Sequence, residues 1–153
     1  MGVMVCIPAS REQARELLAN GSNEPVAAFA ATEHLYQTFD LAPSQDEDAE
    51  FATALIASIA ALTRFGERLV LVADVDAYEP DPATEHDGGV IISRLEPQQI
   101  SAWFVDASPA VAEQASRVAE GLSVDEAWEL PDVVDLLANH DLCWHDSSER
   151  MAI

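Results

Sequence analysis

The strongest constraint on the fold is a continuous apolar run in the middle of the chain. Residues 68–75 read RLVLVADV, with hydrophobic side chains at consecutive positions rather than at every second one. A strand with solvent on one face alternates apolar and polar residues, whereas a strand covered on both faces does not. The run therefore predicts a central strand that is buried between two layers of other elements.

Shorter apolar runs and helical repeats lie on either side of this strand. Further strands are expected at residues 3–7, 26–31, 90–94, 102–106 and 141–145. Ser10 is expected to cap a helix, Gly66 to end one, and Phe51 to lie in a buried stripe of apolar side chains three and four positions apart. Such signals predict helices at residues 10–20, 32–39, 47–65, 108–120, 123–128 and 131–139, with one more helical turn within 147–153. The interleaved order predicts an α/β fold leaning towards α+β: a single domain over residues 1–153, with a mixed sheet of about five to six strands flanked by helices.

The composition excludes several classes of protein. The chain contains no lysine, and its seven basic residues, all arginine, stand against 28 Asp and Glu, for a formal net charge of -21. A Walker-type phosphate loop, Schiff-base or pyridoxal phosphate chemistry and a protein kinase each require a lysine amine. Because duplexes and anionic lipids attract basic surfaces, we expect neither nucleic acid nor a membrane as a partner.

The cysteines and the N-terminus bear on the compartment. Cys6 and Cys143 both lie in apolar stretches, which favours unpaired thiols over a disulfide. The first residues lack the basic region of a signal peptide, and no segment reaches the ~18 consecutive apolar residues of a membrane span. A cytoplasmic location follows as a prediction. Since no glycine-rich dinucleotide loop, G-x-S-x-G, HExxH or CxxC pattern is present, no cofactor is predicted.

Aspartates that follow apolar strands are the best candidates for chemistry. Asp74 follows RLVLV within the central run, Asp106 follows AWFV, and Asp146 follows LCWH. Ligands gather at strand ends in α/β sheets, and converging carboxylates bind Mg²⁺ or Ca²⁺ or form an acid/base pair. The structural alternative is that these aspartates terminate strands and cap helices. His86 lies in an acidic segment, residues 76–89, that is expected to form a loop, and it has no partner nearby in the sequence.

Three aromatic side chains offer an interaction surface. Trp103 and Phe104 are neighbours in one predicted strand and therefore point to opposite faces of the sheet. One of them, or Trp144, is a candidate for an exposed sheet face that forms a homodimer contact. The alternative is a strand with both faces in the core. A homodimer is predicted on the first interpretation.

Several segments together resemble a known family. VMVCIPAS at residues 3–10, VAAFAAT at 26–32, LVLVADV at 69–75, AWFVDAS at 102–108 and LCWHD at 142–146 are similar to an uncharacterised family of small, acidic, cytoplasmic actinobacterial proteins. The resemblance spans nearly the whole chain, although Ser10 stands where threonine is usual and His145 where tyrosine is frequent. The family has no assigned function, so the resemblance implies a single domain and no particular activity.

Three functions remain open from the sequence. The first is a non-catalytic cytoplasmic binding or interaction protein, favoured because no catalytic signature is present. The second is a metal-dependent enzyme that uses the strand-end carboxylates Asp74, Asp106 and Asp146. The third is an acidic mimic of nucleic acid that binds a basic partner. Whether the protein is an enzyme is left undecided.

Overall fold

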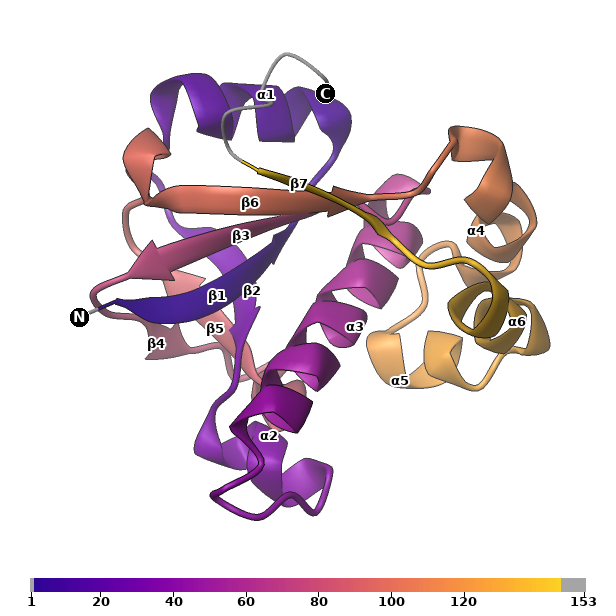
Figure 1. Ribbon diagram of the computed structural model, residues 1–153, viewed down its shortest axis with the longest axis horizontal. Helices are drawn as coiled ribbons and strands as arrows, with labels where there is room; N and C mark the ends of the chain where they lie inside the picture. Colours follow the sequence, from indigo (N-terminus) through magenta and orange to yellow (C-terminus); the bar gives the residue numbers. More distant parts are fainter. Residues whose placement is uncertain (1, 147–153) are drawn as a thin grey trace.

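The apolar run in the middle of the chain forms β3 (Val70–Val75), an inner strand of a seven-stranded sheet (Figure 1). This computed structural model describes residues 2–146. The strands lie in the order β4-β5-β2-β1-β3-β6-β7. The bounds of the other strands are Val3–Pro8 for β1, Val26–Ala30 for β2, Glu79–Pro80 for β4, Gly89–Ile92 for β5, Ile100–Val105 for β6 and Cys143–Asp146 for β7.

All strand pairings in the described sheet are antiparallel, which differs from the expected mixed sheet. The reason lies in the helical crossover between β2 and β3. Both strands pair antiparallel with β1, so they run in the same direction, but β1 lies between them. The interleaved order of helices and strands predicts that strands joined by a helix are parallel neighbours. Here β2 and β3 are parallel but are not neighbours. The fold is a single α+β domain, as predicted from the sequence.

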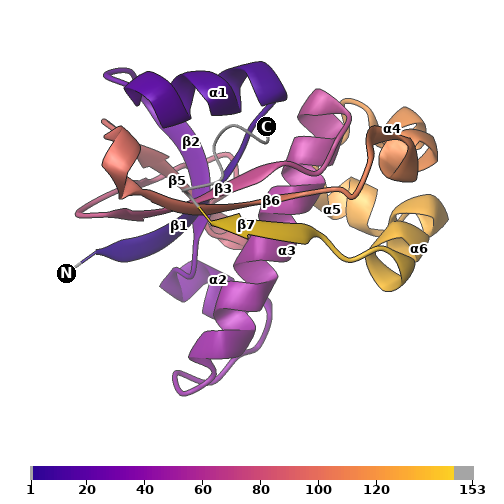
Figure 2. The ribbon, with the colours of Figure 1, turned by 45° about the horizontal axis from the view of Figure 1, so that its top comes forward.

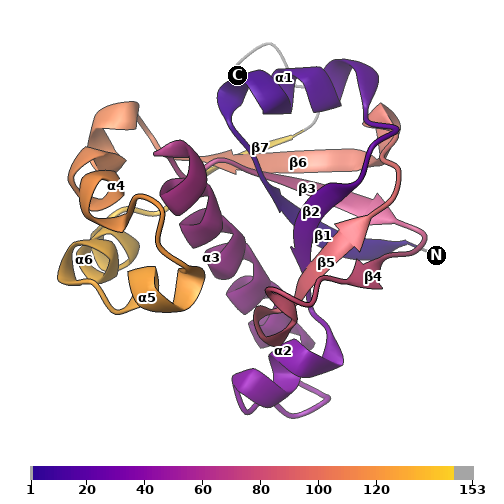
Figure 3. The ribbon, with the colours of Figure 1, turned by 180° about the vertical axis from the view of Figure 1, so that it is seen from behind.

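The two faces of the sheet carry very different numbers of helices. Helix α1 (Arg11–Asn20) lies on one face, and the long α3 (Asp46–Phe65) crosses the other (Figure 1). The last three helices gather on the side of α3 away from the sheet (Figure 3). The remaining helices are α2 (Glu33–Thr38), α4 (Glu113–Ala119), α5 (Val124–Trp128) and α6 (Pro131–Asn139), with 3₁₀ turns η1 (Glu85–Asp87), η2 (Pro97–Gln99) and η3 (Pro109–Ala112).

Two apolar clusters, one on each face, hold these layers together. On the α1 face, Leu17 of the helix packs with Leu71 and Trp103 of the sheet. On the α3 face, Ile56 and Ile59 of the helix pack with buried side chains of β1, β2 and β3. The same cluster continues into α4, α5 and α6. Alternating side chains of β3 supply both clusters. This two-sided burial is what the unbroken apolar run predicted.

Local signals place most element ends correctly. Ser10 caps α1 by accepting a hydrogen bond from the Gln13 backbone, and Gly66 ends α3 in the left-handed conformation, with φ 82°. Two segments differ from expectation: residues 76–89, expected as a loop, contain β4 and η1, and the helix expected at 108–120 divides into η3 and α4. The helical turn expected within residues 147–153 lies outside the described part of the chain.

Candidate functional site

The three strand-end aspartates do not form a common site. β3 and β6 are antiparallel, so Asp106, after the end of β6, lies beside the start of β3, whereas Asp74 lies at the end of β3. At roughly 3.3 Å per residue, six residues of strand separate the two by about 20 Å. Asp146 pairs with Ala102, near the start of β6. The expectation assumed that strand ends meet at one edge, which holds for parallel strands but not for antiparallel ones.

Asp106 joins parts of the chain that are far apart in sequence. Its Oδ1 lies 2.8 Å from Nε and 2.6 Å from Nη2 of Arg68, and its Oδ2 accepts a 2.9 Å hydrogen bond from the Arg68 backbone. Nη2 of Arg68 also donates to the carbonyl of His140 at 2.7 Å. Both charged side chains are at most 2 % exposed. The pair therefore fixes β3, β6 and the end of α6 together, which gives Asp106 a structural role.

A groove lies between α3 and the edge of the sheet formed by β6 and β7. Its larger hollow has a volume of about 590 Å³ and its smaller one about 290 Å³, and both are lined by Phe51 and Ala54 of α3 and by Phe104 of β6. Trp144 of β7 borders the larger hollow. Phe51 is 67 % exposed and Trp144 59 % exposed, the highest fractions among the large apolar side chains of residues 2–146. The groove thus has an apolar lining that faces solvent.

The groove is open because α3 does not cover the whole face of the sheet. α3 packs mainly on β1, β2 and β3, so the strands beyond them keep part of this face uncovered. β7 is the last strand in the sheet order, at the outer side of β6 (Figure 2). In the register of this pair, Trp144 lies opposite Phe104, on the face that α3 crosses. Their side chains are therefore neighbours on an open sheet surface.

Acidic side chains surround the apolar lining. Glu47 and Glu50 of α3 border the larger hollow on one side and Asp146 of β7 on the other, and Asp141 borders the smaller one. All four are exposed. The arginine in the lining, Arg68, is already paired with Asp106. The groove consequently combines an apolar floor with a negative rim, which is the complement of a surface that carries apolar and basic side chains.

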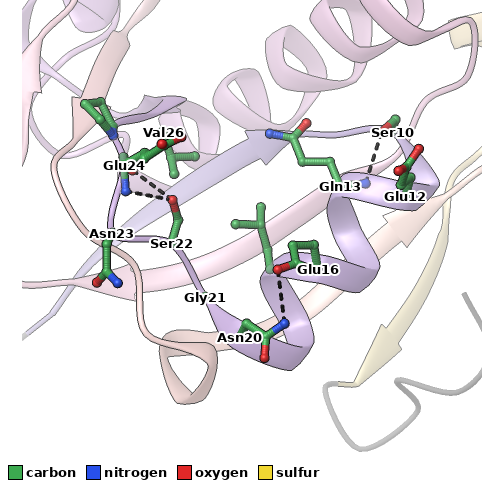
Figure 4. A pocket seen from close by; sticks show the side chains of 12 residues that line it. Ser10, Glu12, Gln13, Glu16, Asn20, Gly21, Ser22, Asn23, Glu24 and Val26 are labelled. Atoms are coloured by element: carbon green, nitrogen blue, oxygen red, sulfur yellow. Dashed lines mark hydrogen bonds between the residues drawn. The ribbon is translucent and has the colours of Figure 1, made fainter.

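A second hollow, of about 740 Å³, lies beside α1 (Figure 4). Some of its polar groups make local contacts: the Ser10 hydroxyl accepts from the Gln13 backbone, and the Asn20 amide donates to Glu16. Gly21 stands at its edge with φ 67°, and a Cβ there would come within 2.2 Å of the Leu95 carbonyl oxygen. These contacts cap α1 and hold its end against the segment that contains Leu95. We therefore assign this hollow a structural role.

A cluster of polar side chains, His86, Asp87 and Asp125, joins η1 to α5. Nε2 of His86 lies 2.6 Å from a carboxylate oxygen of Asp125 and 3.1 Å from one of Asp87. The hydrogen bond to Asp125 is the main reason why the pKa of His86 is raised. Burial, followed by the nearby charge of Asp125, raises the pKa of Asp87 to about 6. Sequence reasoning missed this cluster because Asp125 lies 39 residues from His86, and no local pattern connects them.

The fold and these sites define the class of the protein: an α+β domain with a single antiparallel sheet, an open groove on one face and an acidic surface. Across the described residues, none of the helices has the length and apolar character needed to cross a membrane. Residues 3–153 match the family of unknown function DUF6912, and the chain belongs to this family. No curated protein and no solved structure gives a significant match to the chain.

Proposed function

We propose that this protein is a non-catalytic binding protein that holds a basic amphipathic helix of a partner protein in the groove between α3 and β7. The observation that carries the proposal is that Phe51 and Trp144, the two most exposed large apolar side chains of the described residues, line the same groove. Contiguous exposed apolar patches on soluble proteins commonly mark interaction sites.

The width of the open surface supports a helix as the occupant. Neighbouring strands lie about 4.8 Å apart, so β6 and β7 together present a strip about 10 Å wide. A helix with its side chains has a diameter of about 10–12 Å. A partner helix laid beside α3 would complete the layer that α3 begins, with its apolar face on Phe104 and Trp144. Recognition of an amphipathic helix in an apolar groove is a recurrent mode of binding.

The charge of the rim supports a basic partner. Glu47, Glu50 and Asp146 place negative charge along the larger hollow. A helix that presents Lys or Arg at its flanks gains complementary contacts there, and the net charge of -21 speeds its association. A second copy of this chain carries the same negative charge and fits the rim poorly. The homodimer predicted from the sequence therefore needs a different surface.

The cysteines support the cytoplasm as the location. Cys6 is buried and Cys143 exposed, and both are free. An exposed free thiol on an edge strand suits a reducing compartment, where disulfides are rare. We keep the cytoplasmic location as part of the proposal.

The test is a binding measurement with a synthetic 18-residue peptide that carries leucine on one helical face and lysine on the other. We expect the peptide to bind and Trp144→Ala to weaken binding by about tenfold or more, because a central aromatic anchor commonly contributes at least 2 kcal/mol. Phe65→Ala is the matched control, since Phe65 is also exposed, at 42 %, but does not line either hollow of the groove.

Charge alone attracts a lysine peptide to so acidic a chain, so a scrambled peptide of the same composition is measured in parallel. Equal affinity for both peptides, or equal loss in the Trp144→Ala and Phe65→Ala variants, would contradict the proposal. Sedimentation of the protein without peptide provides a further check. A dimer that dissociates on Trp144→Ala would identify a second copy as the occupant and overturn the assignment to a basic helix.

A further inference from the structure

The cluster of His86, Asp87 and Asp125 is a second candidate site, independent of the groove. One nitrogen and two carboxylate oxygens from these residues all lie within 4.8 Å of one another. They come from two elements: His86 and Asp87 from η1, and Asp125 from the first turn of α5. Gly88 closes η1 in the left-handed conformation, with φ 85°, and a Cβ there would come within 2.4 Å of the Ala30 carbonyl oxygen. The fold therefore holds η1 tightly against the end of β2.

The burial of Asp87 distinguishes this cluster from ordinary surface acids. Asp87 is 4 % exposed, and its carboxylate is directed towards His86 and Asp125. Acidic groups are seldom buried without a partner that balances their charge. Within residues 2–146, no arginine forms an ion pair with Asp87 or with Asp125. The chain has no lysine to take that role, so two neighbouring carboxylates depend on His86 or on an external cation.

We propose that His86, Asp87 and Asp125 bind a Zn²⁺ ion. Imidazole nitrogen and carboxylate oxygen are both Zn²⁺ ligands, and three protein ligands with a water molecule in the fourth position form a complete tetrahedral shell. The His86 and Asp125 side chains are 52 % and 59 % exposed, which leaves a path for the ion and room for that water. Mg²⁺ and Ca²⁺ prefer oxygen ligands alone, so the imidazole favours the transition metal.

The candidate ligand atoms are close enough to converge on one ion, since all lie within 4.8 Å of one another. Bonds of about 2.0–2.1 Å in a tetrahedral shell separate the ligand atoms by about 3.3 Å. The His86 nitrogen is 3.1 Å from Asp87, close to this value, and 2.6 Å from Asp125. Asp125 and His86 are exposed side chains, so a widening of about 0.7 Å is accommodated without disturbing the core. The buried Asp87 provides the fixed ligand, and the other two close on the ion from the surface.

A bound ion would link η1 to α5, two elements that are far apart in the sequence. η1 lies next to α2 and the sheet, whereas α5 belongs to the group of helices beyond α3. Such a link restricts the motion of the late helices relative to the sheet. Zn²⁺ bound here would raise the stability of the fold, because a ligand bound only to the native state stabilises that state.

The experiment titrates ZnCl₂ into the full chain, after treatment with a chelator, and measures binding by calorimetry. Wild type is expected to show one site with affinity in the micromolar range or tighter, and a raised Tm at saturating Zn²⁺. His86→Gln and Asp125→Asn are each expected to weaken this site by at least about tenfold, since loss of an outer-shell partner alone costs 10–100-fold. Both side chains are exposed, so neither change threatens the fold.

His34→Gln is the matched control. His34 is a similarly exposed histidine, at 56 %, in the neighbouring helix α2, and its Nε2 lies 4.0 Å from Glu85 rather than within the cluster. The Zn²⁺ affinity of the His34→Gln variant should equal that of the wild-type protein. The proposal would be overturned if His86→Gln and Asp125→Asn left the Zn²⁺ affinity unchanged. Absence of binding by the wild-type protein at micromolar Zn²⁺, or equally tight binding of Mg²⁺, would also overturn it.

Discussion

At β6 and β7 the two faces of the sheet differ in burial: one is covered and the other is open to solvent. Both are built from neighbouring residues. Trp103 points to the α1 face, is 1 % exposed and stacks on His145 with ring centroids 4.0 Å apart. The next residue, Phe104, points to the α3 face and is only half-buried, beside the exposed Trp144. Large aromatic side chains are thus present on both faces, but only one face is covered. The α3 face alone leaves a large aromatic side chain of this region mostly in solvent, and the proposed function rests on that exposure.

The first prediction removes an aromatic side chain from each face in turn. Trp103→Ala is expected to lower the free energy of unfolding by about 3–5 kcal/mol, because it empties a well-packed site. Trp144→Ala is expected to change it by less than about 0.5 kcal/mol, because the side chain is mostly in solvent. Denaturant unfolding measures both values. Similar losses in the two variants would mean that Trp144 is part of the core and that the α3 face is not open.

The second prediction concerns the rigidity of the end of the groove, where Arg68 and Asp106 join the strands to α6. Asp106→Ala leaves the Arg68 guanidinium buried without its partner, so we expect a loss of about 3–5 kcal/mol in unfolding free energy. Glu113→Gln is the control. It removes the partner of Arg117 in an exposed pair and should cost less than about 1 kcal/mol. A small effect of Asp106→Ala would show that this end of the groove is loosely held and not preformed.

The third prediction uses the two thiols to compare a buried position on the α3 face with the free edge of the sheet. Burial, with a smaller contribution from Glu50, raises the pKa of Cys6 from 9.0 to about 12. Cys6 lines the larger hollow but is 0 % exposed, whereas Cys143 is exposed in β7. Since the thiolate is the reactive form, a thiol reagent at pH 8 should label one cysteine in the native protein and both after unfolding.

The sign of the pH effect follows from the same shift. Between pH 9 and about 12 the unfolded chain loses the Cys6 proton while the folded chain keeps it, so stability falls as pH rises through this window. Cys6→Ala should remove that part of the fall. Rapid labelling of Cys6 in the native state would indicate that the groove opens into the core.

Sequence patterns predicted the elements of the fold better than their arrangement. The apolar run of β3, the serine cap of α1 and the glycine after α3 are local signals, and the structure confirms them. Strand order depends on contacts between distant segments, so the position of β1 between β2 and β3 was not predictable from local signals. The pairing of Arg68 with Asp106, 38 residues away, belongs to the same class of contact.

The candidate sites show a similar division. Trp144 was identified as a possible surface residue from its position in an apolar strand. Phe51 was assigned to the buried stripe of its helix, because its spacing fits that stripe, but it lies near the start of α3, at the groove. An exposed apolar residue on a helix is recognisable only when the neighbouring elements are placed. The cluster of His86, Asp87 and Asp125 was not recognisable for the same reason.

The central claim is that the uncovered half of the α3 face binds a basic amphipathic helix. Titration of ¹⁵N-labelled protein with the leucine–lysine peptide, followed by amide chemical shifts, tests it directly. The account predicts that the shifts concentrate in the first half of α3 and in β6 and β7, and that they disappear with Trp144→Ala. Shifts spread over the acidic surface, or centred on α1, would contradict it.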